Sequence, residues 1–299
     1  MNEPYKIQVE LLNKVAILLK LQKDDIDEIG KALSVNEDRY GIKAALLVNK
    51  ARYLNLFSDI IFFLAEKLLS EKGENFRFYV GHLRTLVEIY TRLLYSDNQT
   101  ETRRMALWVA DTLFTFGYTT YESGKGMNNI RDIDVKNEEF YKTQILSYKS
   151  FINDEKIDIP NNRKDFTRKK LKKLKLEYPS PKSVLDQNYT KDCSSETSAV
   201  WPGSIGAARK AYICYSNYIH GNHLTGASHG NEKFWILGTS VILSSLLVEL
   251  VNKKTINNIR VSNFESWLID VKANKKAFTK FWKLGNLERQ SSPKEDNLT

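Results

Sequence analysis

Between residues 42 and 69 apolar side chains recur at intervals of three, four and seven positions. They are Leu47, Leu54, Phe57, Ile61, Leu64 and Leu68. In an α-helix this spacing places them in one stripe, which another element has to cover. Residues 76 to 95 repeat the pattern after the short break Lys72-Gly-Glu-Asn. The sequence therefore predicts two long helices that run antiparallel and cover each other.

The same periodicity predicts helices elsewhere in the chain. They are expected at residues 7–21, 24–33, 101–121, 137–152, 203–220 and 232–252. A chain of 299 residues with six prolines and 14 glycines has too few turn residues for a many-stranded sandwich or barrel. The predicted fold class is all-α, a helical bundle. Its expected parts are N-terminal helices in 1–41, the bundle core in 42–252, C-terminal helices in 253–284 and a disordered tail in 285–299.

Residues 124–200 are the least regular part of the expected bundle. Tyr178-Pro-Ser-Pro holds no regular helix by the sequence rules for proline, and polar residues dominate the segment. We expect a polar, partly irregular insertion that is the least buried third of the protein. The insertion also contains the basic run RKDFTRKKLKKLK, residues 163–175. Its eight Lys or Arg residues and one Asp give +7 of the net charge of +9. Attraction to a polyanion such as RNA is therefore expected at this run.

The chain shows no signal for secretion or for a membrane. Its first residues lack a basic segment followed by an apolar run, so a cytoplasmic location is expected. The 18-residue stretch 234–251 is just long enough to cross a bilayer, but it contains three serines and Glu249. We interpret it as a buried core helix. Cys193 and Cys214 lack the paired spacing of a zinc site and are expected to be reduced thiols.

Two polar groups stand out on otherwise apolar helices. Arg84 and Glu88 are four residues apart and therefore lie on one face of the second long helix. His220 comes at the predicted end of the 203–220 helix, in Tyr215-Ser-Asn-Tyr-Ile-His220, where it can exchange protons near neutral pH. For Arg84 and Glu88 the structural alternative is an ion pair that organises the bundle. For His220 it is a histidine that caps the C-terminal end of the helix.

Metal or nucleotide chemistry finds little support in the sequence. His220, His223 and His229 lie close together, but no carboxylate or cysteine is spaced among them to complete a zinc site. There is also no phosphate-binding glycine loop and no His-Glu-x-x-His motif. We therefore expect no metal and no cofactor.

The two polar segments together resemble a known group of proteins. A helix with Arg84-x-x-x-Glu88, followed later by a helix that ends Tyr-Ser-x-Tyr-x-His220, is similar to a group of bacterial all-helical proteins. This group distantly resembles the higher eukaryote and prokaryote nucleotide-binding (HEPN) superfamily, and the resemblance covers about 42–121 and 200–251. It implies a metal-independent endoribonuclease of toxin–antitoxin or phage-defence type, acting as a homodimer. Active members carry an Arg a few residues before the His, whereas here the nearest is Arg209.

Two functional hypotheses follow. In the first, His220 is the general acid or base, Arg84 stabilises the charged phosphorane, and Glu88 orients one of them. Tyr215, Ser216 and Asn222 would add hydrogen bonds to the substrate, and Lys169, Lys170, Lys172 and Lys173 would attract RNA. In the second, the protein is a non-catalytic binding or regulatory partner of another protein in a defence system. The first hypothesis, RNA cleavage, requires Arg84, Glu88 and His220 to meet in one polar cleft.

Overall fold

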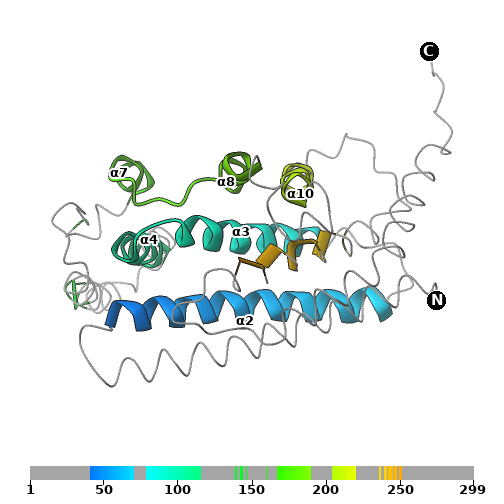
Figure 1. The fold of residues 1–299 in the computed structure, drawn as a ribbon, viewed down its shortest axis with the longest axis horizontal. Helices are drawn as coiled ribbons and strands as arrows, with labels where there is room; N and C mark the ends of the chain where they lie inside the picture. The colour runs from blue at the N-terminus through cyan, green and yellow to red at the C-terminus, as the bar shows by residue number, and fades with distance from the viewer. Residues whose placement is uncertain are drawn as a thin grey trace, which may run out of the picture. The chain divides into compact units, whose positions relative to one another are not determined.

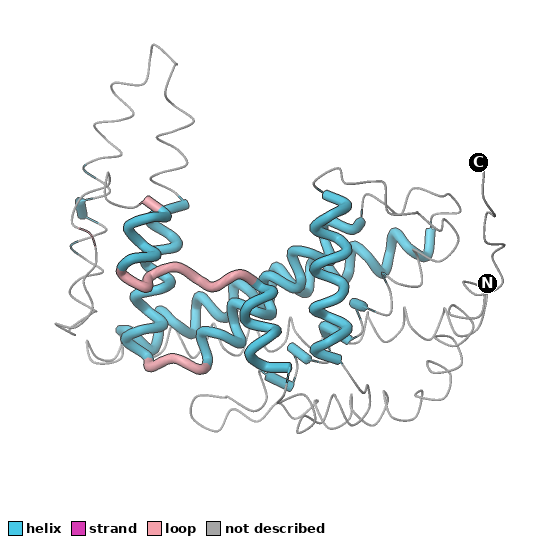
Figure 2. Tube along the Cα trace, turned by 90° about the horizontal axis from the view of Figure 1, so that it is seen from above, coloured by secondary structure: helices cyan, strands magenta, loops and turns pink. Residues whose placement is uncertain are grey.

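A computed structural model describes residues 41–70, 79–115, 167–189 and 204–219, with individual positions in 139–160 and 236–250. The described residues are 89% helical and include no strand, so the all-α prediction is confirmed (Figures 1 and 2). The expected N-terminal helices, C-terminal helices and tail lie outside the described residues.

The chain divides into two compact units. The first comprises Met1–Asp24, Ala51–Arg92 and Ser180–Thr299, and the second comprises Asp25–Lys50 and Leu93–Pro179. The division falls inside helix α2 (Gly41–Ser70) and inside helix α3 (Val80–Asp97). These two helices match the long pair predicted at 42–69 and 76–95 to within a few residues.

In the first unit, α2 and α3 run antiparallel. The Arg92 Nη1 atom donates a hydrogen bond to the Tyr53 hydroxyl at 3.3 Å, and the Phe63 ring meets the His82 ring edge-on at 4.9 Å. As the position in α2 rises from 53 to 63, its partner in α3 falls from 92 to 82, which is the register of an antiparallel pair. The side chains between them are almost wholly buried: Leu54, Phe57, Ile61, Leu64, Leu83, Leu86 and Val87.

Helices α8 (Pro181–Asn188) and α10 (Ser204–Ile219) lie side by side in the first unit (Figures 1 and 2). Arg209 of α10 donates a hydrogen bond to Asp186 of α8, which also accepts one from Lys182 at 2.9 Å. An added Cβ on Gly206 would come within 3.0 Å of the Tyr189 ring, so glycine at this position allows the close approach. The described positions in 236–250 are helical and buried, in agreement with the predicted core helix.

One buried serine of this last helix, Ser240, has its hydrogen-bond partner within the helix itself. The Ser240 hydroxyl donates a hydrogen bond to the Ile236 carbonyl at 2.7 Å, one turn earlier, and so has a partner without water. Among the described residues, none of the helices is both long and apolar enough to cross a membrane.

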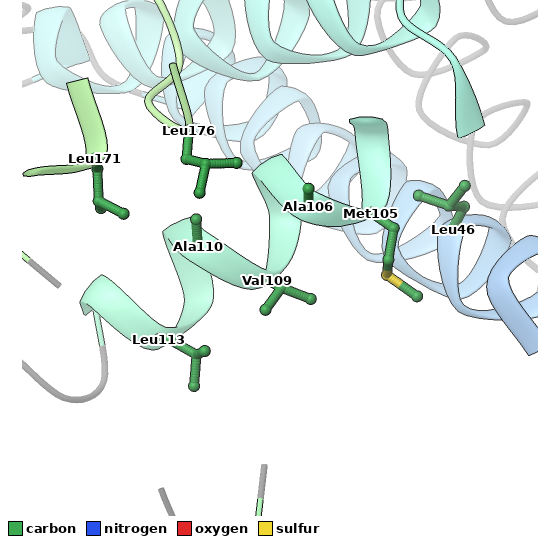
Figure 3. Packing of buried hydrophobic residues seen from close by; sticks show 8 residues of the cluster. All are labelled: Leu46, Met105, Ala106, Val109, Ala110, Leu113, Leu171 and Leu176. Carbon is green, nitrogen blue, oxygen red and sulfur yellow. The ribbon is translucent and has the colours of Figure 1, made fainter. Parts of the chain in front are cut away.

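The core of the second unit is built around α4 (Glu101–Leu113). Thr100 caps this helix, its hydroxyl accepting a hydrogen bond from the Arg103 amide at 3.3 Å. Figure 3 shows the cluster of buried side chains around α4. They are Leu46, Met105, Ala106, Val109, Ala110, Leu113, Leu171 and Leu176. The predicted end of this helix at residue 121 lies outside the described residues.

Residues 167–189 differ from the irregular segment expected there. They form α7 (Arg168–Lys173) and α8, and they bury Leu171, Leu176, Val184 and Leu185. Helix α8 starts at Pro181, directly after the non-helical Tyr178-Pro-Ser, with Ser180 as its N-cap. Proline at the first helical position loses no hydrogen bond, which is why Pro181 begins a helix here. This part of the expected insertion contributes to both hydrophobic cores.

Candidate functional site

Arg84 and Glu88 form an ion pair on α3. The Arg84 Nε atom donates to Glu88 Oε1 at 2.9 Å, and the two side chains are 26% and 36% exposed. The guanidinium carbon of Arg84 also lies 5.7 Å from the centre of the Tyr212 ring, which belongs to α10. A cation at this distance from an aromatic face is attracted to it. Arg84 is therefore held between its own helix and α10, and it retains exposure to solvent.

The other predicted residues of this site are on α10 or just beyond it. Tyr215 and Ser216 are one turn after Tyr212 on the same helix. His220 and Asn222 follow the described end of α10 and lie outside the described residues. The structure thus brings Arg84 and Glu88 together and sets Arg84 against the helix that leads to His220. The convergence of Arg84, Glu88 and His220 in one cleft stays a prediction.

A fourth histidine, His82, lies on the same helix as Arg84. Its ring packs edge-on against Phe63 and is half-buried. This burial lowers the pKa of His82 below its ordinary value of 6.5, because a charged imidazole loses hydration there. Burial therefore favours the neutral form of the His82 imidazole.

The basic run has a defined structure in the second unit. Thr167 caps α7, its hydroxyl accepting a hydrogen bond from the Lys170 amide at 3.3 Å. Leu171 is 3% exposed and faces the core around α4, whereas the cations on either side of it face solvent. The exposed cations of this segment are Arg168, Lys169, Lys170, Lys172, Lys173 and Lys175. We call these six residues the α7 basic surface.

A Schellman motif ends α7 and fixes the chain that follows. The Leu176 amide donates to the Leu171 carbonyl at 2.8 Å, and the Lys175 amide donates to the Lys172 carbonyl at 3.0 Å. Lys175 takes the left-handed conformation that this motif needs, with φ of 56°. Leu171 and Leu176 are the paired apolar residues that commonly accompany the motif, and both are buried in the same cluster.

Two arginines attach α7 to α4. The Arg168 guanidinium lies 5.7 Å from the centre of the Phe114 ring, just beyond α4. Arg103 of α4 donates a hydrogen bond to the Lys175 carbonyl. Together with the buried leucines, these contacts hold the α7 basic surface in a fixed position on the second unit.

Sequence reasoning missed Tyr212 and Arg103 as parts of these sites, and it did not predict the contact of Arg168 with Phe114. Tyr212 carried a usable signal, since it precedes Ser216 by four residues and so shares a helical face with it. Arg103 and Arg168 carried none, because their partners are 72 and 54 residues away in sequence. Within the described residues, no group of three His, Cys, Asp or Glu side chains is placed to hold a metal ion.

Comparison with family models, with curated proteins and with solved structures gives no match.

Proposed function

We propose that the protein binds RNA through the α7 basic surface. The observation that supports this is the anchoring of six exposed cations on one short segment by the buried Leu171 and Leu176. No carboxylate occurs between Thr167 and Lys175, and within the described residues none of the six cations forms an ion pair. Such a group of positive charges attracts the phosphate backbone and releases its counterions.

The test replaces the four central lysines by glutamine. The variant carries Lys169→Gln, Lys170→Gln, Lys172→Gln and Lys173→Gln, all at exposed positions. Here K is the association constant for RNA, and log K falls as log salt rises. Each lost phosphate contact makes this slope shallower by roughly 0.7 to 0.9, so the slope should become shallower by about three when four contacts are lost. The measurement is fluorescence anisotropy of labelled RNA across a salt series.

A matched control removes the same charge elsewhere. It carries substitutions at exposed cations outside α7, namely Arg52→Gln, Lys142→Gln, Lys182→Gln and Lys210→Gln. If binding is localised, this control keeps nearly the wild-type salt slope. Equal slopes in the two variants would show that net charge alone attracts RNA, and the proposal would be wrong.

A second candidate function is metal-independent cleavage of RNA at the first unit. It is favoured by the position of Arg84, which is held by Glu88 and Tyr212 against the helix that precedes His220. In this reaction the ribose 2′-oxygen attacks the adjacent phosphorus and the bond to the 5′-oxygen breaks. The products are a 2′,3′-cyclic phosphate and a 5′-hydroxyl. His220 takes the 2′-hydroxyl proton or protonates the leaving 5′-oxygen, while Arg84 stabilises the phosphorane charge.

In this candidate function Glu88 fixes the orientation of Arg84, and Tyr215, Ser216 and Asn222 donate or accept hydrogen bonds at the substrate. The corresponding assay incubates purified protein with total RNA in EDTA. Fragments that end in a cyclic phosphate support the cleavage reaction. RNA that stays intact while it binds supports the alternative, a non-catalytic binding partner in a defence or toxin–antitoxin system.

A further inference from the structure

The cations that the α7 basic surface offers to a ligand are chiefly ammonium groups. Five of its six residues are lysines, and the sixth, Arg168, has its guanidinium over the Phe114 ring. The neighbouring Arg103 is also engaged within the protein, because its guanidinium donates a hydrogen bond to the Lys175 carbonyl. Arginine reads guanine through two parallel hydrogen bonds and stacks on bases, whereas an ammonium acts as a hydrated point charge. The surface is therefore equipped for phosphates rather than for base edges.

The aromatic side chains described in the second unit contact other side chains of that unit. Trp108 and Phe114 pack against the core around α4. Tyr178 meets Tyr95 edge-on at 6.2 Å, and its hydroxyl accepts a hydrogen bond from Ser96 at 3.3 Å. The four aromatic side chains described in this unit, those of Tyr95, Trp108, Phe114 and Tyr178, are each partly buried. Proteins that bind single strands normally stack bases on exposed aromatic rings, which contribute about 1 to 3 kcal/mol per base.

From these two observations we infer that the α7 basic surface binds the backbone of duplex RNA without reading its sequence. A duplex carries two phosphate strands side by side and so presents more negative charge to a fixed cluster of cations than a flexible single strand does. A single strand gains most where its bases can stack, and the aromatic side chains described in the second unit are at most partly exposed. This inference depends on the proposed RNA binding and specifies the form of RNA that is bound.

The experiment uses the full chain and RNA that the protein cannot cleave. RNA with 2′-O-methyl groups lacks the 2′-hydroxyl nucleophile, so binding is measured free of any nuclease activity. Four labelled probes are compared by anisotropy in EDTA: a G·C-rich duplex, an A·U-rich duplex, and unpaired single strands of U and of A of the same length. The expected result is at least tenfold tighter binding of both duplexes than of either strand, with the two duplexes within about threefold of each other.

The outcomes separate the inference from the proposed function. Single strands that bind as tightly as the duplexes, or a difference above tenfold between the two duplexes, would overturn the inference and leave RNA binding intact. A duplex preference that persists in the four-lysine variant would overturn it too, since another surface would then be responsible. Failure of all four probes to bind would overturn the proposed function itself.

Discussion

The Leu176 amide donates to the Leu171 carbonyl at 2.8 Å, and the two side chains pack in the same buried cluster. This pair ends α7 and at the same time fastens it to α4. The stability of the α7 basic surface therefore depends on residues that carry no charge, and its charges can be changed without loss of the fold.

The first prediction concerns Lys175, which has a left-handed backbone at φ 56°. A side chain with a Cβ is strained in this conformation by roughly 1 to 2 kcal/mol, and glycine is not. We expect Lys175→Gly to stabilise the protein by up to about 1 kcal/mol, the gain being reduced by the larger chain entropy of unfolded glycine. Urea denaturation measures the change. Lys173→Gly is the control, because residue 173 is helical and the substitution there should destabilise by about 1 kcal/mol.

A second prediction concerns Asp97, whose side chain is 4% exposed and lies between two cations. Its carboxylate is 3.3 Å from Lys50 Nζ and 3.6 Å from Arg104 Nη1. Asp97→Asn leaves these two partly buried cations without their counter-charge, and we expect a loss of about 2 to 4 kcal/mol in unfolding free energy. Glu139→Gln, at an exposed helical position, serves as control and should change it by less than about 0.5 kcal/mol. Equal effects of the two substitutions would contradict the assigned role of Asp97.

The pH dependence of the α8–α10 contact gives a third prediction. Hydrogen bonds from Lys182 and then from Arg209 lower the pKa of Asp186 below its ordinary value of 3.8. Since the folded pKa lies below the unfolded one, the stabilisation is fully present above about pH 4 and is lost as pH falls through the folded pKa. Asp186→Asn should therefore be less stable than the wild type at pH 7, and this difference should shrink in acid. Thermal unfolding of both proteins from pH 7 to pH 3 measures it, and a constant difference would refute the pairing.

The fourth prediction tests the cleavage reaction through His220. If His220 transfers a proton, His220→Ala should abolish the EDTA-resistant cleavage while the unfolding free energy stays within about 1 kcal/mol of wild type. His229→Ala is the matched control, since this histidine belongs to the same stretch of sequence and has no assigned role. Cleavage at the wild-type rate in His220→Ala would remove this residue from the mechanism. Cleavage that needs a divalent cation would point to different chemistry.

The long helices were predictable because their signal is local. Leu54, Phe57 and Ile61 in α2 recur with the helical period, and each is wholly buried in the structure. The same holds for Leu83 and Leu86 in α3. Many turns of repeated pattern leave no alternative that would bury as much apolar surface.

Helix α7 was not predictable in this way. Its six residues include a single apolar side chain, Leu171, and one residue cannot establish a period. An isolated helix of this length is unstable in water, so tertiary contacts with the core around α4 have to maintain it. Those contacts join residues that are far apart in the sequence, and no local pattern reports them.

The candidate site in the first unit was predictable only in part. The spacing of Arg84 and Glu88 fixes their contact, because residues four apart are neighbours on any helix. The contact between Arg84 and Tyr212 spans two helices and follows from their packing, which the sequence pattern does not specify.

The anchoring of α7 has a consequence for proteolysis. Trypsin cleaves after lysine and arginine, and residues 168–175 contain the densest group of its target bonds in the described chain. A protease needs an extended, locally opened backbone, and here the backbone is helical, capped at both ends and pinned by two buried leucines. The segment that looks most vulnerable in the sequence should be cut only as fast as the second unit opens, so its digestion rate reports the opening equilibrium of that unit.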